Sequence, residues 1–262
     1  MEIENTVAIV TGGGSGIGRA TALRLAQEGA TIAVVDVDEE GGRETARQID
    51  ATGGIAGFFR ADVTSVEEMR KLFEAVESAF GGVDIVHNNA GIITGLPRFP
   101  ETPEAEWSRM LDINLRGVIL GTQLAIGAMR KRGGGAIVNT ASLAGIGYGF
   151  PPNPVYAASK GGVVLFTASL APLKDSDNIR VNCVCPGVVD TPMLTRASEA
   201  GSDGERDAVM QRLRSLPMLQ PDDIADAVIT LIRDDSLAGR ALMVRNGMAP
   251  ELYRTPEAPR PV

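Results

Sequence analysis

Short, nearly continuous apolar segments alternate with longer segments of helical periodicity along most of this chain. Such apolar strands are buried on both faces, as in a parallel sheet that helices cover on either side. The pattern therefore predicts a single α/β domain with a doubly wound parallel sheet of about seven strands and helices on both faces. The predicted strands are Thr6–Val10, Thr31–Asp36, Ile55–Arg60, Val83–His87, Ala136–Thr140, Arg180–Cys185 and Ala241–Arg245. The predicted helices are Ile17–Glu28, Val66–Phe80, Glu104–Met129, Val155–Leu170 and Pro221–Ile232.

We expect this domain to span residues 1–248, with a substrate-binding segment at 188–216 that interrupts the alternation. The tail 249–262 carries four prolines, which exclude a regular helix, and we expect it to be a frayed terminus. The short acidic N-terminus has no secretory signal, and no apolar run approaches the roughly 18 residues of a membrane span. These features predict a cytoplasmic protein without a membrane partner.

The composition excludes several classes of protein. With 25 Lys and Arg against 33 Asp and Glu, the net charge is −8, which argues against nucleic acid as a partner. Two cysteines cannot form a disulfide framework. Cys183 and Cys185 share one face of a strand, and the single histidine, His87, belongs to another strand, so a metal site lacks ligands. We interpret all three as packed core residues and expect no metal.

A glycine-rich segment, Thr-Gly-Gly-Gly-Ser-Gly-Ile-Gly at 11–18, joins the first strand to the first helix. Its glycines let the backbone turn tightly and approach a pyrophosphate at the helix N-terminus. Asp36 ends the second strand, near the spacing of a carboxylate that holds an adenosine ribose diol. That carboxylate would repel a 2′-phosphate, Val37 follows it, and we expect Arg19 to face away from the ribose. The segment therefore predicts a dinucleotide site that prefers NAD to NADP.

These motifs resemble the short-chain dehydrogenase/reductase family, whose loop has the form Thr-Gly-x-x-x-Gly-x-Gly. The resemblance covers about Thr6 to Gly247 and implies a Rossmann fold and an oxidoreductase. The match continues in order through Asp62-Val63, Asn88-Asn89-Ala90-Gly91, Asn114, Ser142, Tyr156-x-x-x-Lys160 and Pro186-Gly187.

The resemblance implies how NAD would lie across the carboxyl ends of the strands, where open α/β sheets bind ligands. Asp62 would cap the adenine amino group, and the backbone at 89–91 would pass the adenosine ribose. Residues 186–191 would hold the nicotinamide carboxamide. The residues that the resemblance assigns to the cofactor are Gly12, Ser15, Gly16, Ile17, Gly18, Asp36, Val37, Asp62, Val63, Asn89, Ala90, Gly91, Tyr156, Lys160, Pro186, Gly187, Val189 and Thr191.

The resemblance also implies a catalytic group of Asn114, Ser142, Tyr156 and Lys160. Tyr156 would be the general acid/base, although a free tyrosine, with a pKa of about 10, is too weakly acidic at neutral pH. Lys160 lies one helical turn later on the same face, so its ammonium can favour the phenolate. Ser142 would hydrogen-bond the substrate oxygen, and Asn114 would hold a water that links Lys160 to solvent.

Three segments are expected to form the substrate pocket: Ile92–Arg98, Leu143–Asn153 and Val188–Leu216. Their apolar residues and few cationic groups predict a lipophilic secondary alcohol or ketone. Within the family, the stretch 153–160 is loosely similar to prostaglandin dehydrogenases, in which a glutamine three residues before the tyrosine assists the substrate. Asn153 holds that place here, and we expect it to contact the substrate together with Ser142 and Tyr156.

Two features depart from the family pattern. Pro172 is expected to end or bend the catalytic helix near Ala171, although the family often packs this helix in a bundle between subunits. A homo-oligomer is expected, and tetramer and dimer both stay open. The last strand ends in Arg245-Asn246-Gly247, where the family often has Asp-Gly-Gly. Leu252 and Tyr253 suggest that the tail covers a neighbouring subunit's cleft.

Three functions remain compatible with the sequence, and an NAD-dependent alcohol dehydrogenase or carbonyl reductase is favoured. An NADP-linked reductase of the ketoacyl type would need a basic docking surface and a basic residue near the 2′-phosphate, and neither is evident. A non-catalytic NAD-binding regulatory protein would have no need of Ser142, Tyr156 and Lys160. The sequence leaves the specific substrate and the physiological direction open.

Overall fold

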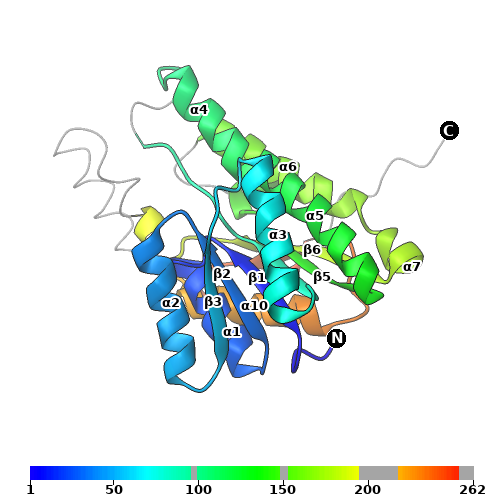
Figure 1. Cartoon of the computed structure of the whole chain (residues 1–262). Helices are drawn as coiled ribbons and strands as arrows, with labels where there is room; N and C mark the ends of the chain where they lie inside the picture. Colours follow the sequence, from blue (N-terminus) through cyan, green and yellow to red (C-terminus); the bar gives the residue numbers. More distant parts are fainter. Residues whose placement is uncertain (96–98, 148–152, 195–217, 254–262) are drawn as a thin grey trace.

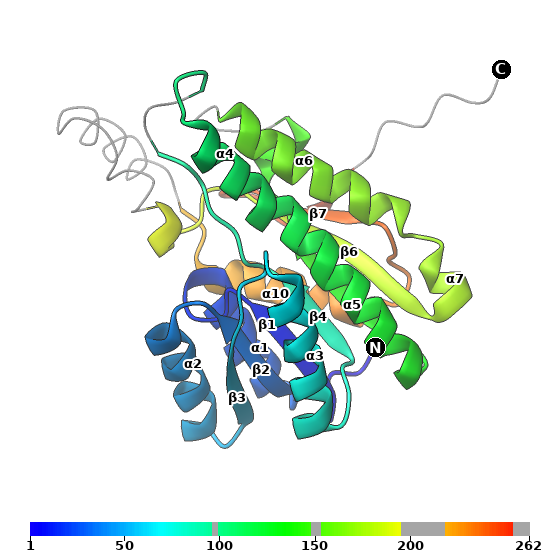
Figure 2. The same ribbon diagram turned by 45° about the horizontal axis from the view of Figure 1, so that its top comes forward.

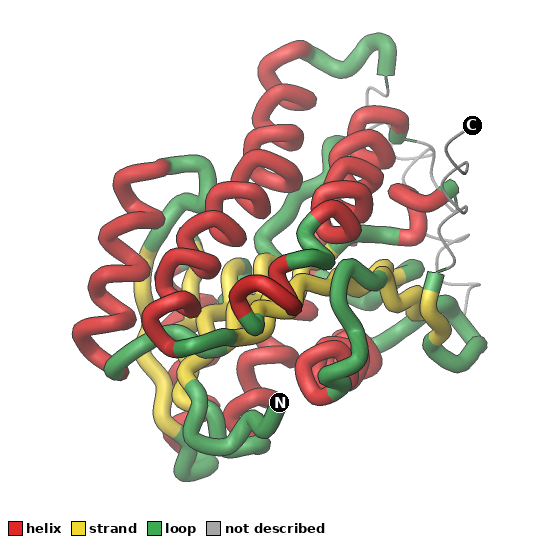
Figure 3. The backbone as a smooth tube through the Cα atoms, turned by 90° about the vertical axis from the view of Figure 1, so that its right-hand side faces the viewer, coloured by secondary structure: helices red, strands yellow, loops and turns green. Residues whose placement is uncertain are grey.

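The computed structural model describes residues 1–95, 99–147, 153–194 and 218–253. In these residues one sheet of eight strands, in the order β3-β2-β1-β4-β5-β6-β7-β8, lies between two layers of helices (Figures 1 and 3). Its strands are β1 (Val7–Thr11), β2 (Thr31–Asp36), β3 (Ile55–Arg60), β4 (Ile85–Asn88), β5 (Gly135–Thr140), β6 (Ile179–Pro186), β7 (Ala241–Val244) and β8 (Glu251–Leu252). The first seven are parallel, as predicted, and β8 pairs antiparallel with β7.

Helices cover both faces of the sheet, as predicted. Helices α1, α2 and α10 pack on one face, and α3, α5 and α6 pack on the other (Figure 2). The helical elements are α1 (Gly16–Gln27), α2 (Glu39–Ala51), α3 (Val66–Phe80), α4 (Glu104–Leu111), the π turn η1 (Asp112–Arg116), α5 (Gly117–Arg132), the 3₁₀ turn η2 (Leu143–Ile146), α6 (Pro154–Ser169), α7 (Leu173–Asp177) and α10 (Pro221–Arg233). No helix in the described part of the chain is long and apolar enough to span a membrane.

The strand order reverses between β1 and β4, which are neighbours in the sheet. At such a point the loops after the two strands diverge to opposite faces and leave a crevice at the carboxyl edge. The core on either side is aliphatic: Val10, Leu25 and Val228 are buried on the α1/α10 face, and Ile9 and Val76 on the α3/α5 face. Burial of each such side chain contributes about 1.5–3 kcal/mol, so a rigid apolar core fixes this edge.

Helix α2 is absent from the predicted elements. Two adjacent glycines, Gly41 and Gly42, weaken its helical signal, and only a narrow strip that includes Ala46 and Ile49 is buried. Asp38 begins the helix by accepting a hydrogen bond from the backbone N–H of Gly41 at 3.2 Å. Strand β3 differs from the prediction in another way: it is an edge strand, and Ile55 is 61% exposed rather than buried on both faces.

The beginning of the tail is ordered, so the expectation of a frayed terminus is wrong for residues 251–253. Leu252 pairs with Leu242, and the backbone N–H of Tyr253 donates to the Ala241 carbonyl at 2.8 Å. Both side chains pack against apolar clusters of their own chain, which accounts for the apolar pair that suggested a neighbouring subunit's cleft. Residues 254–262 lie outside the described residues.

One predicted helix end is confirmed. Helix α6 stops at Ser169, and Pro172 begins the separate short helix α7, as the proline predicted. Helix α5 ends on Gly133, whose φ of +83° lies in the left-handed region that a glycine adopts without strain. The basic residues before it, Arg130 to Arg132, lie in the last turn, where their charge is favourable.

Candidate active site

The glycine-rich loop packs too closely for side chains. A Cβ atom on Gly18 would lie 2.0 Å from the carbonyl oxygen of Gly12, and Gly12 and Gly16 have φ values of +64° and +50°. Ser15 begins α1 without a side-chain cap, and the first turn of this helix has no acidic residue. The N-terminal N–H groups of α1 are therefore suited to an anion such as a pyrophosphate.

The carboxylate of Asp36 is fixed beside this loop. One oxygen accepts a hydrogen bond from the backbone N–H of Gly14 at 2.9 Å, and the other accepts from Asp38 N–H at 3.0 Å. Arg19 donates to the carbonyl oxygens of Gly14 and Gly41 and, at 3.0 Å, to the Thr45 hydroxyl. Its guanidinium is thus engaged between the loop and α2, while Asp36 presents a negative charge at the end of β2.

The glycines that begin α2 have a packing role that the sequence did not reveal. A Cβ atom on Gly41 would lie 2.8 Å from the carbonyl oxygen of Gly14, and one on Gly42 would lie 2.2 Å from the Phe58 ring. Helix α2 can therefore approach the glycine-rich loop and hold Asp36 in place. The Gly-Gly pair just after the second strand was the available signal for this contact.

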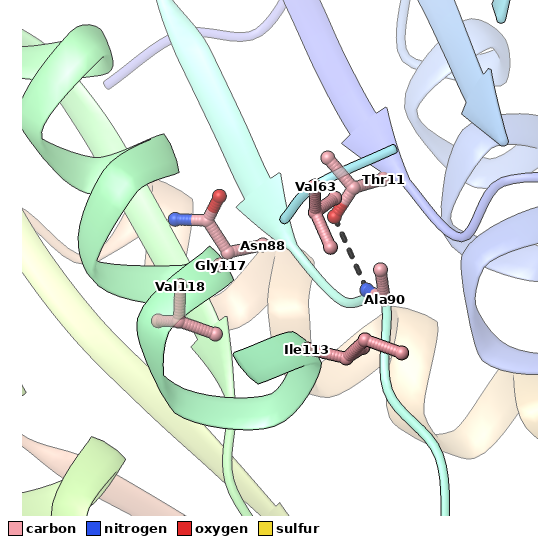
Figure 4. Close-up of a pocket in the computed structure, with 7 residues that line it drawn as sticks. All are labelled: Thr11, Val63, Asn88, Ala90, Ile113, Gly117 and Val118. Atoms are coloured by element: carbon pink, nitrogen blue, oxygen red, sulfur yellow. Dashed lines mark hydrogen bonds between the residues drawn. The ribbon is translucent and has the colours of Figure 1, made fainter. Parts of the chain in front are cut away.

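A small pocket lies where β1 and β4 end, on the α5 side (Figure 4). The Thr11 hydroxyl accepts hydrogen bonds from the backbone N–H groups of Asn89 at 3.0 Å and Ala90 at 3.1 Å. At the end of β3, Asp62 accepts from the Thr64 N–H and hydroxyl, both at 2.8 Å. The pocket is lined by Thr11, Val63, Asn88, Ala90, Ile113, Gly117 and Val118. The predicted Val63 and Ala90 thus lie together, and Ile113, Gly117 and Val118 were not predicted.

Ser142, Tyr156 and Lys160 come together from β5 and α6. The Ser142 hydroxyl lies near enough to the Tyr156 phenol to lower the pKa of that phenol, and the Lys160 Nζ lies 6.0 Å from the centre of the tyrosine ring. Lys160 is only 3% exposed, and its Nζ donates to the Thr140 carbonyl oxygen at 2.7 Å. Ser142 also begins η2, because its hydroxyl accepts from Ala144 N–H at 3.2 Å.

Burial dominates the electrostatics of this group. Loss of water raises the pKa of Tyr156, and the nearby Ser142 hydroxyl opposes that rise. Burial lowers the pKa of Lys160 from its ordinary value to about 8. Both residues therefore favour their neutral forms in the free protein more than they would in water.

Asn114 lies in the π turn between α4 and α5, and such turns are frequent at functional sites. Its side-chain amide accepts from Ile92 N–H and donates to Ile92 O, both at 2.8 Å. Gly91 lies close to two of the residues predicted to be catalytic: a Cβ atom there would be 3.3 Å from Asn114 Oδ1 and 3.4 Å from Lys160 Nζ. The predicted Asn114, Gly91 and Lys160 are therefore neighbours.

Asn153 begins α6 and tethers it to the segment after β4. Its side-chain oxygen accepts from Tyr156 N–H at 2.9 Å, and its nitrogen donates to the Thr94 hydroxyl at 2.9 Å. Asn153 thus holds the first turn of the helix that carries Tyr156. Parts of the predicted substrate segments, at 96–98, 148–152 and 195–216, lie outside the described residues.

The turn after β6 lies beside the glycine-rich loop. A Cβ atom on Gly16 would be 3.1 Å from the methyl carbon of Thr191. Val189 is buried, and it bridges to Leu219. Thr191, one of the predicted nicotinamide contacts, therefore lies beside the glycine-rich loop. The residues present fit a dinucleotide that extends from Asp36 to this turn.

Comparison with known proteins decides the family. Residues 6–201 match the short chain dehydrogenase family. The chain belongs to this family. Over 250 residues it is 33% identical to a 3-oxoacyl-(acyl-carrier-protein) reductase of Thermotoga maritima, with 95% of this chain and 99% of the relative covered. It is 36% identical to the cyclohexanol dehydrogenase of an Acinetobacter species, with 90% of each chain covered.

Two further relatives extend the range of similar proteins. The human 15-hydroxyprostaglandin dehydrogenase (NAD(+)) is 36% identical, with 93% of this chain and 92% of the relative covered. A crystal structure of levodione reductase superposes with a TM-score of 0.85 at 34% identity, with 93% of this chain and 97% of that chain covered. This short chain dehydrogenase is therefore an oxidoreductase that acts on CH–OH groups with a nicotinamide cofactor.

The short chain dehydrogenase keeps three polar core residues close to this site. His87 is completely buried in β4, and its Nε2 lies 2.8 Å from the Thr140 hydroxyl oxygen. Burial, aided by the nearby charge of Lys160, lowers the pKa of His87 to about 3. Cys183 and Cys185 are buried, free thiols, and the described residues contain no cluster of metal ligands. The interpretation of these three residues as core is confirmed.

Proposed function

We propose that this short chain dehydrogenase interconverts a secondary alcohol and a ketone of a lipophilic substrate, with NAD as the cofactor and Tyr156 as the general acid/base. The observation that carries the proposal is the juxtaposition of the Ser142 hydroxyl, the Tyr156 phenol and Lys160, whose Nζ lies 6.0 Å from the centre of the tyrosine ring. A hydroxyl and a phenol side by side can both bond one substrate oxygen, so the reacting carbon would be held at a fixed point above the crevice.

The proton moves between the substrate and this chain. In oxidation, the Tyr156 phenolate takes the hydroxyl proton of the alcohol while Ser142 donates a hydrogen bond to the same oxygen. When bound, NAD supplies a hydride acceptor for the carbon that bears the hydroxyl. The ammonium of Lys160 favours the phenolate, and in reduction the Tyr156 phenol returns the proton to the ketone oxygen. Asn114 would hold a water that connects Lys160 to solvent.

We assign NAD to the residues that surround the crevice. Gly12, Ser15, Gly16, Ile17 and Gly18 would hold the pyrophosphate, and Asp36 with Val37 would hold the adenosine ribose. Asp62, Val63, Asn89, Ala90 and Gly91 would line the adenine side, and Pro186, Gly187, Val189 and Thr191 the nicotinamide side, beside Tyr156 and Lys160. The preference for NAD rests on Asp36, because its fixed carboxylate would repel a 2′-phosphate. The NAD(+) in the name of the human relative is consistent with this preference.

A lipophilic substrate is supported by the residues around Ser142. Leu143 and Ile146 of η2 pack onto the apolar cluster beneath α6. Relatives named for cyclohexanol, cyclopentanol and a hydroxyprostaglandin share hydroxyl groups on largely apolar molecules. We propose that Ser142, Asn153 and Tyr156 contact the substrate oxygen or its neighbourhood, without a metal ion.

The deciding experiment is a panel of secondary alcohols with NAD and with NADP, followed by absorbance of the reduced nicotinamide. We expect oxidation of cyclic or long-chain alcohols with at least about tenfold higher kcat/KM for NAD. An NADP preference of that size would overturn the assignment of Asp36. Reduction of ketoacyl thioesters alone would favour an NADP-linked reductase of the ketoacyl type, the alternative that the similarity to the Thermotoga reductase supports. Biological activity that survives Tyr156→Phe would favour a non-catalytic regulatory role.

We also propose a homo-oligomer, either a dimer or a tetramer. Ile119 on α5 and Leu165 on α6 are 40% and 68% exposed and belong to the same helical layer. Large aliphatic side chains at such positions are often covered by a second subunit. Light scattering on the purified protein would give the mass, and Leu165→Glu should lower it. The cytoplasmic location stays a prediction.

A further inference from the structure

The side chain of Asn246 extends the sheet beyond the last strand. The final backbone bond of the β6–β7 ladder joins the Gly187 N–H to the Val244 carbonyl at 2.9 Å. At the next residue, Val188, the side-chain amide of Asn246 replaces the partner strand. Its oxygen accepts from Val188 N–H at 3.1 Å, and its nitrogen donates to Val188 O at 2.8 Å. Both backbone groups of Val188 are thus held by one side chain.

On its other side, the turn at 187–191 is bonded to Leu219, which forms an isolated parallel bridge with Val189. Leu219 N–H donates to Val188 O at 2.9 Å, and Asp190 N–H donates to Leu219 O at 2.9 Å. Val188 is therefore fixed from both sides, between Asn246 and Leu219. Three residues later, Thr191 lies against Gly16 of the glycine-rich loop. The position of this turn sets the distance across the crevice in which a dinucleotide would lie.

The fit between Asn246 and the turn depends on Gly187. A Cβ atom on Gly187 would lie 2.3 Å from the side-chain oxygen of Asn246. The backbone of Gly187 is not in the left-handed region, so the requirement for glycine here is one of space. A glycine at 246 would have no side chain to make these bonds, so they depend on the asparagine of this chain.

We propose that Asn246 is a positioning residue for the nicotinamide end of the cofactor. It acts through Val188: by fixing both backbone groups of that residue, it presents the turn 187–191 to the nicotinamide in one conformation. The inference rests on the proposed binding of NAD across the crevice. It adds that affinity for the nicotinamide half, and not for the adenosine half, depends on Asn246.

The experiment compares two probes, NADH and ADP-ribose, on the full-length protein. ADP-ribose carries the adenosine, the pyrophosphate and the second ribose but no nicotinamide. In Asn246→Gly we expect the Kd of NADH to rise by about tenfold, as for the loss of two modest hydrogen bonds, with the Kd of ADP-ribose changed less than about twofold. Asn246→Asp keeps an acceptor for Val188 N–H but loses the donor to Val188 O, so it should not restore NADH affinity.

A matched control, Asn178, is available at the amino ends of β5 and β6, opposite the ends at which the cofactor would bind. Asn178 also donates from its side chain to a backbone carbonyl, Gly133 O at 3.0 Å, and its φ of +54° suits glycine. Asn178→Gly should leave both dissociation constants unchanged. Equal weakening of NADH and ADP-ribose in Asn246→Gly, or no weakening of either, would overturn the role of Asn246. Failure of the unmodified protein to bind either probe would instead count against the proposed function.

Discussion

The Nζ of Lys160 donates a hydrogen bond to the carbonyl oxygen of Thr140, two residues before Ser142. This bond joins the end of β5 to the middle of α6 through a side chain that also stands behind the Tyr156 ring. Any displacement of α6 would therefore move the lysine, the tyrosine and the end of the strand together. The relative positions of Ser142, Tyr156 and Lys160 therefore depend on this bond as well as on the spacing of Tyr156 and Lys160 along the helix.

Removal of the Tyr156 hydroxyl should abolish proton transfer and spare cofactor binding. We expect Tyr156→Phe to lower kcat by about 10²–10⁴-fold, the usual contribution of a general acid/base. The Kd of NADH, measured by fluorescence, should change little because the ring and Lys160 remain. Ser142→Ala is the companion variant, and it should lower kcat by less than Tyr156→Phe does. Full activity in Tyr156→Phe would contradict the mechanism.

The pH dependence should differ in sign between the two directions. Oxidation needs the Tyr156 phenolate, and burial raises the pKa of this phenol in the free protein, so kcat/KM for the alcohol should increase with pH. Reduction needs the neutral phenol and should decline over the same range. Lys160→Met removes the nearby ammonium and should move the rise to higher pH. A shift to lower pH in this variant would contradict the assigned role of Lys160.

Asp36 should control the choice of dinucleotide. Asp36→Ala removes both the ribose acceptor and the repulsion of a 2′-phosphate, so kcat/KM for NAD should drop by about tenfold while that for NADP rises. Asp38→Ala is the control, since Asp38 is a neighbouring carboxylate that caps α2. It should lower the free energy of unfolding by about 1 kcal/mol without altering the NAD/NADP ratio.

The buried imidazole of His87 should make the protein sensitive to mild acid. Its pKa is about 3 in the folded state, against about 6.5 in an unfolded chain, so below pH 6.5 only the unfolded state takes up the proton. The free energy of unfolding should therefore fall by about 2 kcal/mol between pH 8 and pH 5. Since the chain has one histidine, His87→Leu should flatten this dependence in urea titrations. An unchanged slope would show that other groups cause it.

Gly187 and Asn246 should be energetically coupled. Gly187→Ala places a methyl group against the Asn246 side chain, at a cost of about 1–3 kcal/mol in the free energy of unfolding without cofactor. In the Asn246→Gly background the same substitution should cost much less. A double-mutant cycle by chemical denaturation measures the difference, and additive effects would contradict the contact.

The apolar strands and the glycine-rich loop were sufficient to predict the parallel sheet and the place of its crevice. The bounds of β2, β3 and α3 agree with the prediction. For α3 the apolar residues recur with helical periodicity, and Ser65 marks the start of the helix as its N-cap. Helix α2 was missed because its glycines serve a contact with Gly14 that is distant along the chain. The antiparallel β8 was missed because two residues carry no periodicity.

In the site too, some features could be predicted from the sequence and others depend on contacts between residues distant along the chain. The family resemblance implied the grouping of Ser142, Tyr156 and Lys160, and helical spacing alone predicts only that Tyr156 and Lys160 share a face. The hydrogen-bond partners of the asparagines could not be predicted from the sequence. Asn153 bonds Thr94 and Asn246 bonds Val188 only because the tertiary fold brings these residues together. No local pattern distinguishes an asparagine that clamps a remote backbone from one that faces solvent.

Strand β8 reduces the number of unpaired backbone groups at the edge of the sheet that begins with β7. An uncovered strand presents a row of free N–H and C=O groups on which a foreign chain can dock, and this is a common route to unwanted association. Here Leu242 and Met243 of β7 are paired on both sides, and in the described residues the outermost strand, β8, is two residues long and follows Pro250, which has no N–H to donate. Over the part of the chain that the structure describes, the exposed margin of β8 therefore offers a second molecule few backbone groups on which to continue the sheet.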